Sequence, residues 1–429
     1  MILAIFLISI FTFLFLGVPV AFSILLTVLT MAEASGVTSY EIVPSYLYSG
    51  VNNFALLAIP FFVFCGDLMT AGDLSKGIVE FCRVLLGHVR AGIGYAAILA
   101  CMIFAALTGA AVVTISAIGG IMLPIMIKEG YDASDSTACV CAGSITGPII
   151  PPSLPMVIFG VLSGASVTKM FIGGVVPGVI TGLVCMLAWY FMNKNKNYAL
   201  MPKATPREVW TAFKKAFPAL MMPVIMMGGI LSGIFTPTEA AVVAIFYTIL
   251  VGIFIHKELT LKSFMASLKP TSWLTGRVLV LVFTATAFGY LLTSYRIPVE
   301  IANWILSFTN NVNLVWFFVV ILLLFLGMFM ETLAIIMLVT PVLLPIMTAY
   351  GVDPIHFGII LICCCGIGFS TPPLGENMFI ASGIANISLE EISLKALPLV
   401  AINIAVIAIL VMFPDIVLFL PNLMGTGLQ

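Results

Sequence analysis

The sequence predicts an all-α polytopic membrane protein with two inverted-topology repeats, each holding a re-entrant helical hairpin and a broken transmembrane helix. Three observations predict this fold. The chain is 62% hydrophobic and 8% charged, with a mean hydropathy of +1.23, and a water-soluble protein could not bury so much apolar surface. Two long apolar segments are interrupted by prolines. One fixed displacement along the chain superimposes the first of these segments on the second.

The first interrupted segment covers residues 136–162. Its middle contains two glycines and three prolines: Gly143, Gly147, Pro148, Pro151 and Pro152. Proline lacks a backbone N–H and its ring clashes with the preceding helical turn, while glycine leaves helical geometry at little cost. We therefore expect two half-helices and a non-helical joint, which lipid tolerates only where it faces protein or water. Such joints hold sodium and anionic substrates in secondary transporters; a purely structural kink is the alternative interpretation of this segment alone.

The second interrupted segment, residues 356–384, repeats the first. Pro372 and Pro373 lie 221 residues after Pro151 and Pro152, since 372 − 151 and 373 − 152 are both 221. The same displacement pairs Pro124 with Pro345, Gly130 with Gly351, Asp132 with Asp353, Gly147 with Gly368 and Pro177 with Pro398. Chance similarity of apolar sequence would not keep one register through these residues, so we interpret the chain as an internal duplication. Corresponding interruptions in two halves point to a transport site.

The distribution of basic residues predicts the orientation, because cytoplasmic loops are rich in Lys and Arg. The central linker, residues 193–217, holds Lys194, Lys196, Lys203, Arg207, Lys214 and Lys215, and is predicted to be cytoplasmic. Counting spans back from this linker puts the N-terminus in the periplasm and both ends of segment 91–127 in the cytoplasm. That segment is either two full spans or a re-entrant hairpin that turns at residues 107–111. Each arm would be about 25 Å long, shorter than the ~30 Å hydrocarbon core, which favours the hairpin.

The second half repeats this plan. A capping box at residues 236–239 separates two spans, a cytoplasmic loop is expected at 256–273, and a span at 274–294 leads outward. A second hairpin, residues 312–348, is predicted to turn at 327–332 and to enter from outside. On this count fifteen of the seventeen Lys and Arg residues are cytoplasmic, the exceptions being Lys169 and Arg296.

Each half crosses the membrane five times on this count, so the two halves have opposite orientations. The first inverted repeat is predicted to cover residues 1–192, and the second residues 218–429.

Polar side chains gather at the two joints. They are Ser144, Thr146, Ser153, Ser370, Thr371 and Asn377. As a set around two broken helices they suit oxygen-rich sodium sites, although each hydroxyl could instead bond to its own helix. Glu331 at the second hairpin turn either neutralises a cation or orients a substrate, or else stabilises the turn as a neutral acid. Arg296 is either a receptor for a substrate carboxylate or a snorkelling residue at the membrane interface.

Other function classes find no support in the sequence. It has no nucleotide-binding motif, no Ser-His-Asp arrangement and no nucleic-acid-binding patch, so we predict neither an enzyme nor a nucleic-acid partner. The nine cysteines lie almost wholly in apolar segments without metal-type spacing, so we expect them to be small packing residues rather than disulfide partners or ligands of a transition metal. The energy for transport would have to come from an ion gradient.

Three motifs together resemble the large membrane subunit of TRAP transporters, the tripartite ATP-independent periplasmic transporters. They are GPIIPPSLPM at 147–156, FTPTEAA at 235–241 and STPPLGENMF at 370–379. The resemblance covers essentially the whole chain and implies a scaffold plus an elevator-type transport domain in the bacterial inner (cytoplasmic) membrane. It also implies sodium-coupled uptake of an organic acid in which this chain is one of several subunits. A periplasmic substrate-binding protein and a small four-helix membrane subunit are the implied partners.

The resemblance implies sodium between each hairpin turn and its neighbouring joint. The residues implied for the first sodium site are Thr108, Gly109, Ser144, Gly147 and Ile150. Those for the second are Gly327, Glu331, Gly366, Phe369 and Thr371, and the substrate residues are Ser153, Arg296, Glu331 and Asn377. The chain departs from the family pattern with Ala110 and Ala111 at the first turn, where small hydroxyl residues are common, and with Glu331 where Asp is commoner.

The resemblance makes sialic acid and C4-dicarboxylates the expected substrate classes, with sialic acid first. Two alternatives remain: a stand-alone sodium/anion symporter of similar inverted-repeat fold, and a passive channel. Uptake by this chain alone would favour the symporter, and uptake that survives collapse of the sodium gradient would favour the channel.

Overall fold

The computed structural model describes residues 2–35, 43–72, 74–196, 198, 201–373 and 375–424, and within these ranges the regular structure is helical. The helices of the first half are α1 (Ile2–Phe15), α2 (Val20–Ser35), α3 (Val43–Val51), α4 (Ala58–Ala71), α5 (Leu74–Leu86), α6 (Gly92–Thr108), α7 (Ala111–Thr114), α8 (Gly120–Lys128), α9 (Ala133–Ser144), α10 (Leu154–Ser163) and α11 (Val167–Asn193). Those of the second half are α12 (Pro206–Leu231), α13 (Pro237–Leu250), α14 (Leu261–Ser294), α15 (Ile297–Phe308), α16 (Val312–Gly327), α17 (Thr332–Ala349), α18 (Pro354–Gly368), α19 (Glu376–Ala385), α20 (Leu389–Met412) and α21 (Asp415–Leu423). Three short elements complete the chain: η1 (Phe54–Leu57), η2 (Ile115–Gly119) and η3 (Val251–Ile255).

The surface of the helices is suited to lipid. Eight helices of the described part of the chain are long and apolar enough to cross a membrane. Large apolar side chains point away from the protein, among them Phe254, Trp273, Phe317 and Phe318, which are 58–77% exposed. A soluble monomer does not expose so many large apolar groups. The fold is therefore that of a multi-pass membrane protein, as the composition predicts.

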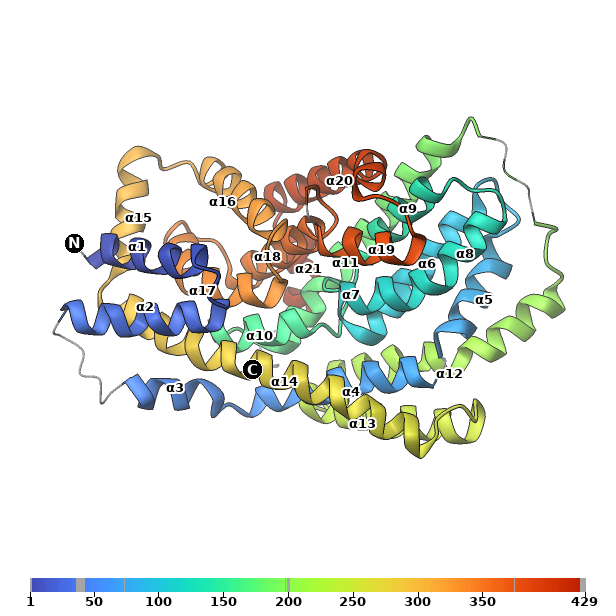
Figure 1. Ribbon diagram of the computed structural model, residues 1–429, viewed down its shortest axis with the longest axis horizontal. Helices are drawn as coiled ribbons and strands as arrows, with labels where there is room; N and C mark the ends of the chain where they lie inside the picture. Colours follow the sequence, from blue (N-terminus) through green and yellow to red (C-terminus); the bar gives the residue numbers. More distant parts are fainter. Residues whose placement is uncertain are drawn as a thin grey trace.

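Helix α14 organises one side of the molecule. It is 34 residues long and packs along α2, α3 and α4. Figure 1 shows these helices, together with α12 and α13, as a long layer along the lower edge of the view. The broken helices α9/α10 and α18/α19 lie above this layer, with the helices that pack on them.

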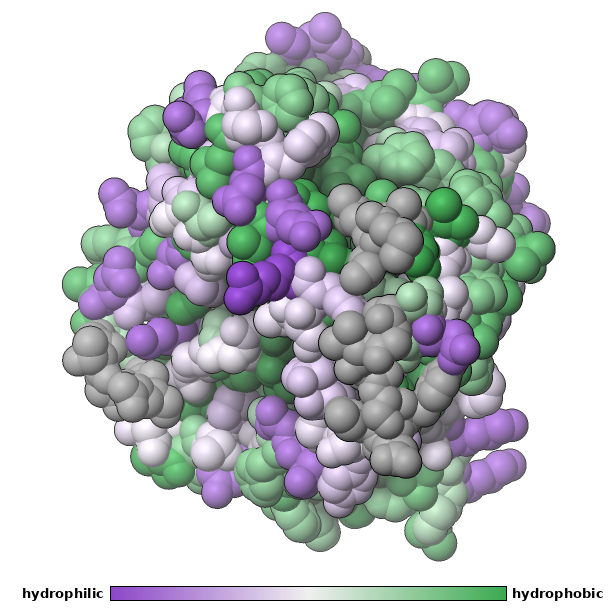
Figure 2. All heavy atoms as spheres, turned by 90° about the vertical axis from the view of Figure 1, so that its left-hand side faces the viewer, coloured by the Kyte–Doolittle hydropathy of each residue, from purple (hydrophilic) through white to green (hydrophobic). Residues whose placement is uncertain are grey.

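The two hairpins approach from opposite ends of the molecule. The α6–α8 hairpin lies at the end that holds α9 and the start of α12, and the α16–α17 hairpin lies at the end that holds α1 and α15 (Figure 1). Figure 2 shows the latter end, where hydrophilic residues are interspersed with apolar ones and gather near the middle of the face. This arrangement is what two oppositely oriented halves require; the orientation in the membrane stays a prediction.

Paired positions of the duplication have the same local geometry. Asp132 and Asp353 are the N-caps of α9 and α18, and each carboxylate accepts N–H groups two and three residues later. The Ser134 hydroxyl and the Asp135 N–H, which donate to Asp132, hold the pKa of this carboxyl below its usual range. Gly130 and Gly351 both adopt positive φ, +84° and +78°. Both broken helices thus begin with the same turn and cap.

Two helices begin earlier in the sequence than the apolar runs indicate. Residues 256–273 are not one cytoplasmic loop, because α14 begins at Leu261 with a capping box between Thr260 and Ser263. The linker 193–217 is helical from Pro206 onward, since Thr205 caps α12 and Pro206 occupies its first position. In both places a good N-cap starts the helix well before the apolar run, so hydropathy alone sets the boundary too late.

Candidate functional site

The two broken helices are interrupted where their prolines predict. Helix α9 ends at Ser144 and α10 begins at Leu154, while α18 ends at Gly368 and α19 begins at Glu376. Each joint contains a cis peptide bond between its adjacent prolines, Pro151–Pro152 and Pro372–Pro373. In the first joint Pro151 has no N–H to donate, so the carbonyl of Gly147 loses its helical partner. Free carbonyls of this kind are the groups with which broken helices hold a cation.

The first hairpin turn lies directly on the first joint. Gly109 ends α6 with φ of +62°, and Ala110 leads into α7. A Cβ atom added to Gly147 would lie 2.6 Å from the backbone N of Ala111 and 2.7 Å from the carbonyl carbon of Ala110. A Cβ added to Gly109 would collide with the Pro152 carbonyl oxygen. The turn and the joint therefore touch through backbone atoms, with no room for a side chain between them.

The second turn repeats this contact on the second joint. A Cβ atom added to Gly368 would lie 2.6 Å from the Cα and 2.7 Å from the carbonyl carbon of Gly327, where α16 ends. Gly368 is the duplicate of Gly147. The sequence therefore places glycine at both positions where a hairpin turn meets a joint, and backbone oxygens of the two elements are brought together.

The two joints also contact each other through buried polar groups. The Asn377 side-chain amide donates to the Ser144 hydroxyl at 2.9 Å and to the Ser370 hydroxyl at 3.4 Å. Ser370 in turn donates to the Cys141 carbonyl at 3.2 Å. These side chains are at most 1% exposed, and among the described residues the Asn377 Oδ1 atom has no hydrogen-bond partner. An unpartnered, buried carbonyl-type oxygen beside two joints is a suitable ligand for Na⁺.

Several hydroxyls of the implied sites bond to their own helices. Thr108 donates to the Phe104 carbonyl at 3.2 Å, Thr371 to the Ile367 carbonyl at 2.7 Å, and Ser153 to the Pro148 carbonyl at 2.6 Å. A hydroxyl that donates in this way keeps its oxygen lone pairs. These three groups can therefore still act as acceptors for a cation or for donors on a substrate.

Three more residues of the implied sodium sites, Phe369, Gly366 and Ile150, could contribute backbone oxygens only, and one of them faces elsewhere. The Phe369 carbonyl accepts the Asn377 N–H at 3.0 Å, so one lone pair is already engaged. A Cβ on Gly366 would lie 3.1 Å from the Ile145 carbonyl oxygen, so Gly366 faces the first joint rather than the second turn. Ile150 donates its N–H to the Thr146 carbonyl at 2.9 Å, which leaves its own carbonyl as the atom it could contribute.

Glu331 forms an ion pair that the sequence did not reveal. Its Oε2 atom lies 2.7 Å from Nη2 of Arg277, in α14, and the side chains are 24% and 56% exposed. Glu331 is the N-cap residue of α17, but its side chain does not cap that helix. Arg277 directly precedes the uncharged run 278–292. Its position as the last charge before an apolar segment was the signal in the sequence, but nothing in the sequence named its partner.

Arg296 does not join this group. It is exposed and adopts φ of +55° as the N-cap residue of α15. Helix α15 packs against α17. Its first residue, Ile297, belongs to a hydrophobic cluster bordered by Leu338 and Val342, which lie two to three helical turns beyond Glu331. The structure thus pairs Glu331 with Arg277 and places Arg296 at the exposed start of α15. That both Glu331 and Arg296 contact the substrate stays a prediction.

Two hollows lie between α14 and the two hairpins. One, of about 500 Å³, lies between the first half of α14, α4 and the elements α7 and η2 of the first hairpin, and includes Asp67 and Ser116. The other, of about 480 Å³, lies between the second half of α14, α3, α10 and α17, and includes Tyr290 and Thr340. The layer built on α14 is therefore incompletely packed against the first hairpin near one end and against α10 and the second hairpin near the other.

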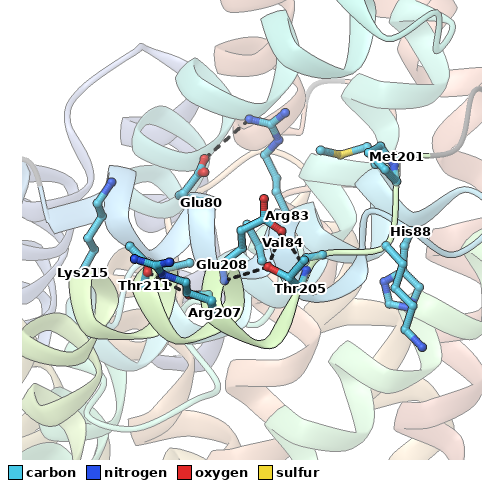
Figure 3. Close-up of a pocket in the computed structure, with 14 residues that line it drawn as sticks. Glu80, Arg83, Val84, His88, Met201, Thr205, Arg207, Glu208, Thr211 and Lys215 are labelled. Atoms are coloured by element: carbon cyan, nitrogen blue, oxygen red, sulfur yellow. Dashed lines mark hydrogen bonds and ion pairs between the residues drawn. The ribbon is translucent and has the colours of Figure 1, made fainter.

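A third hollow, of about 600 Å³, lies between α5 and α12 (Figure 3). Its described lining combines cations such as Arg83 and Arg207 with the carboxylates Glu80 and Glu208. The capping pair Thr205–Glu208 lies in its centre, and Arg83 points toward Glu80 at 3.8 Å (Figure 3). None of its lining residues belongs to a joint or a hairpin turn. This hollow is a polar surface feature apart from the candidate site.

Known proteins share both the sequence and the fold. Residues 7–416 match the family described as "Tripartite ATP-independent periplasmic transporter, DctM component". The isethionate TRAP transporter permease protein DctMQ of Oleidesulfovibrio alaskensis is 40% identical over 410 residues, which are 95% of this chain and 64% of that longer protein. The sialic acid TRAP transporter large permease protein SiaM of Vibrio cholerae is 35% identical over 96% of this chain and 97% of its own length.

A solved structure supports the fold at greater distance. The Alcanivorax borkumensis YdaH transporter matches with a TM-score of 0.63 and 14% identity, over 88% of each chain. At this identity the likeness concerns the fold alone. The family match over nearly the whole sequence confirms the resemblance seen in the motifs. The chain belongs to the DctM family of the tripartite ATP-independent periplasmic transporters, and is a TRAP transporter large permease subunit.

Proposed function

We propose that this subunit couples the inward movement of a small organic acid to a sodium gradient. The observation that carries the proposal is the contact between each hairpin turn and its joint, Gly109 and Ala111 with Gly147 and Pro152, and Gly327 with Gly368. Each contact brings backbone oxygens of a turn and a broken helix together. Sodium is held by such oxygens in secondary transporters, and it would in turn fasten the hairpin to the joint.

Organic acids are the substrate class that the relatives support. Relatives of this chain are named for isethionate, sialic acid, 2,3-diketo-L-gulonate and C4-dicarboxylates. All four carry a carboxylate or sulfonate. We propose a substrate of this class, with sialic acid and C4-dicarboxylates as the first candidates and isethionate added because of the 40% identical relative.

An elevator-type movement suits the packing. The two hairpins meet α14 across two hollows near its opposite ends, of about 500 and 480 Å³. A body that carries both hairpins could slide along α14 by filling one hollow and enlarging the other. Hairpins that approach from opposite ends of the molecule support an inverted repeat (Figure 1). On this proposal residues 193–217 face the cytoplasm and the N-terminus faces the periplasm of the bacterial inner membrane.

The proposed partners are a periplasmic substrate-binding protein and a small four-helix membrane subunit. Reconstitution in liposomes tests the proposal: the subunit is assembled with the small subunit, and labelled sialic acid, succinate and isethionate are offered with the binding protein. Uptake should require an inward sodium gradient and the binding protein. Uptake by this chain without partners would instead establish the stand-alone symporter. Uptake that persists with equal sodium on both sides would establish the channel.

A further inference from the structure

Arg277 is the cation that the fold brings to the second hairpin turn. Its guanidinium contacts Glu331 at 2.7 Å, although the two residues lie 54 positions apart (331 − 277). The side chain of Arg277 is 56% exposed, so part of the guanidinium remains free to meet another group. Among the described residues, no other Lys or Arg forms an ion pair with a residue of a joint or hairpin turn.

Two carboxylates, those of Glu331 and Glu376, act on the one guanidinium of Arg277 near the second hairpin turn. Glu376, the first residue of α19, is near enough that the charges of both Glu331 and Arg277 act on it. Two carboxylates around one guanidinium have a net charge of −1, so an anionic substrate would be repelled as long as both remain charged. An acid group therefore binds Arg277 more favourably once Glu331 is withdrawn or neutralised.

We propose that Arg277 receives the acid group of the substrate and that Glu331 occupies Arg277 when no substrate is bound. The inference rests on the proposed function, because it assumes an anionic substrate. A guanidinium binds a carboxylate or a sulfonate through two parallel N–H donors, which suits the whole substrate class. Glu331 is free to alternate in this way because its side chain does not cap α17.

Sodium binding determines when the substrate replaces Glu331 as the partner of Arg277. A sodium ion held at the second turn, next to Glu331, offsets the negative charge of that carboxylate and weakens its attraction to Arg277. Arg277 then becomes available to the substrate, so substrate affinity rises with sodium concentration. Without Glu331 as a competitor, the dependence of substrate affinity on sodium should largely disappear.

The experiment measures direct binding to the purified membrane complex without the binding protein. The probe is whichever of sialic acid, succinate or isethionate the wild-type complex takes up under a sodium gradient. The readout is the probe concentration that gives half of the maximal thermal stabilisation, at high and at low sodium. The variants are Arg277→Gln, Arg277→Lys, Glu331→Gln and the double variant Arg277→Gln/Glu331→Gln. Lys269→Gln removes an exposed cation from the same helix, eight residues earlier, and serves as the matched control.

The proposal predicts opposite signs for the two partners. Arg277→Gln should raise the half-saturating concentration by roughly ten- to a hundredfold, the range for loss of a charge-assisted hydrogen bond. Arg277→Lys should fall in between, because it keeps the charge and loses the paired donors. Glu331→Gln should lower the concentration at low sodium by about three- to tenfold and remove most of the sodium dependence. Lys269→Gln should match the wild type.

The double variant separates substrate binding from a purely structural ion pair. With Arg277 absent, Glu331 has nothing to compete for, so the double variant should bind as weakly as Arg277→Gln. Recovery toward wild-type affinity in the double variant, or shifts of the same sign in both single variants, would show that the pair only fastens the hairpin. Wild-type uptake combined with unchanged affinity in Arg277→Gln would overturn this inference alone. Absence of sodium-dependent uptake in the wild type would overturn the proposed function, and the inference with it.

Discussion

Replacing Gly147 or Gly368 by alanine tests the site most directly, because each adds one methyl group at a turn–joint contact. The new Cβ would lie 2.6 Å from the Ala111 nitrogen in the first case and 2.6 Å from the Gly327 Cα in the second. Ordinary contacts with a Cβ are about 3.5 Å or longer, so each hairpin turn must retreat by roughly 1 Å. The atoms in the way are backbone atoms, which cannot rotate aside as a flexible side chain would.

Overpacking of this kind costs about 1–3 kcal/mol. On the proposed function, sodium holds the turn and the joint together, so this cost falls on the sodium-bound state. Sodium affinity then drops by roughly 5- to 150-fold, because about 1.4 kcal/mol corresponds to a factor of ten. The assay is the sodium concentration that gives half-maximal uptake in liposomes, together with the melting temperature of the purified complex. Both variants should need more sodium, and added sodium should raise their melting temperatures less than it raises that of the wild type.

Gly120→Ala and Gly383→Ala are the matched controls. A Cβ at either position meets no atom within 4 Å. Gly120 begins α8, the last helix of the first hairpin, and Gly383 lies in α19, which follows the second joint. Alanine should leave sodium dependence unchanged there and add up to about 1 kcal/mol of helix stability. If Gly147→Ala and Gly368→Ala behaved like these controls, the contacts would play no part in holding sodium, and the reasoning from the joints would be refuted.

Three further perturbations test the packing around the joints through thermal melts of the purified complex. Asn377→Ala removes two hydrogen bonds at a fully buried position and should lower the free energy of unfolding by ~2–4 kcal/mol. Ser144→Ala removes one of these bonds and should lower it by about 1 kcal/mol. Equal losses in the two variants would contradict the network. The Asp135 carboxylate is 2% exposed and pairs with Lys196 and Lys395. Asp135→Asn should therefore lower the free energy of unfolding by ~1–3 kcal/mol. An unchanged melting temperature would show that these ion pairs do not stabilise the fold. Asp132→Ala should cost about 1 kcal/mol at pH 7. Because the folded pKa of Asp132 is lowered, this stabilisation is present above the unfolded pKa of about 3.9 and is lost as the pH falls through the folded value, so the two melting curves should converge in acid.

Local sequence was sufficient to predict where the helices break, where the first hairpin turns and where a helix is capped. Prolines cannot continue a helix, so the joints at 144–154 and 368–376 follow from residue type alone. The first hairpin turns at Gly109, within the predicted residues 107–111, because glycine adopts a positive φ without a steric cost. The capping box of Thr236 and Glu239 also forms as expected. In each case the physical cause acts over no more than four residues, which is the range that a single sequence reports.

Contacts between residues far apart in the sequence could not be predicted in this way. Asn377 reaches Ser144 across 233 positions, and Arg277 reaches Glu331 across 54. Each residue stands out in the sequence as polar within an apolar region, but composition does not say which of several such residues meet. Arg277 illustrates this limit, since nothing in the sequence joined it to Glu331. The packing of α14 against α17 brings the two side chains together.

The Asn377 network bears on why the chain carries two joints rather than one. Ser144 belongs to the first broken helix, while Ser370 and Asn377 belong to the second, and one buried amide bonds to both hydroxyls. A buried amide that loses a partner bears the full cost of the unmade bond, so the two joints cannot move apart independently. An ion that orders one joint thereby restricts the other and lowers the entropic cost of ordering it. If sodium binds as proposed, this shared side chain therefore couples the two halves without requiring a movement of the surrounding helices.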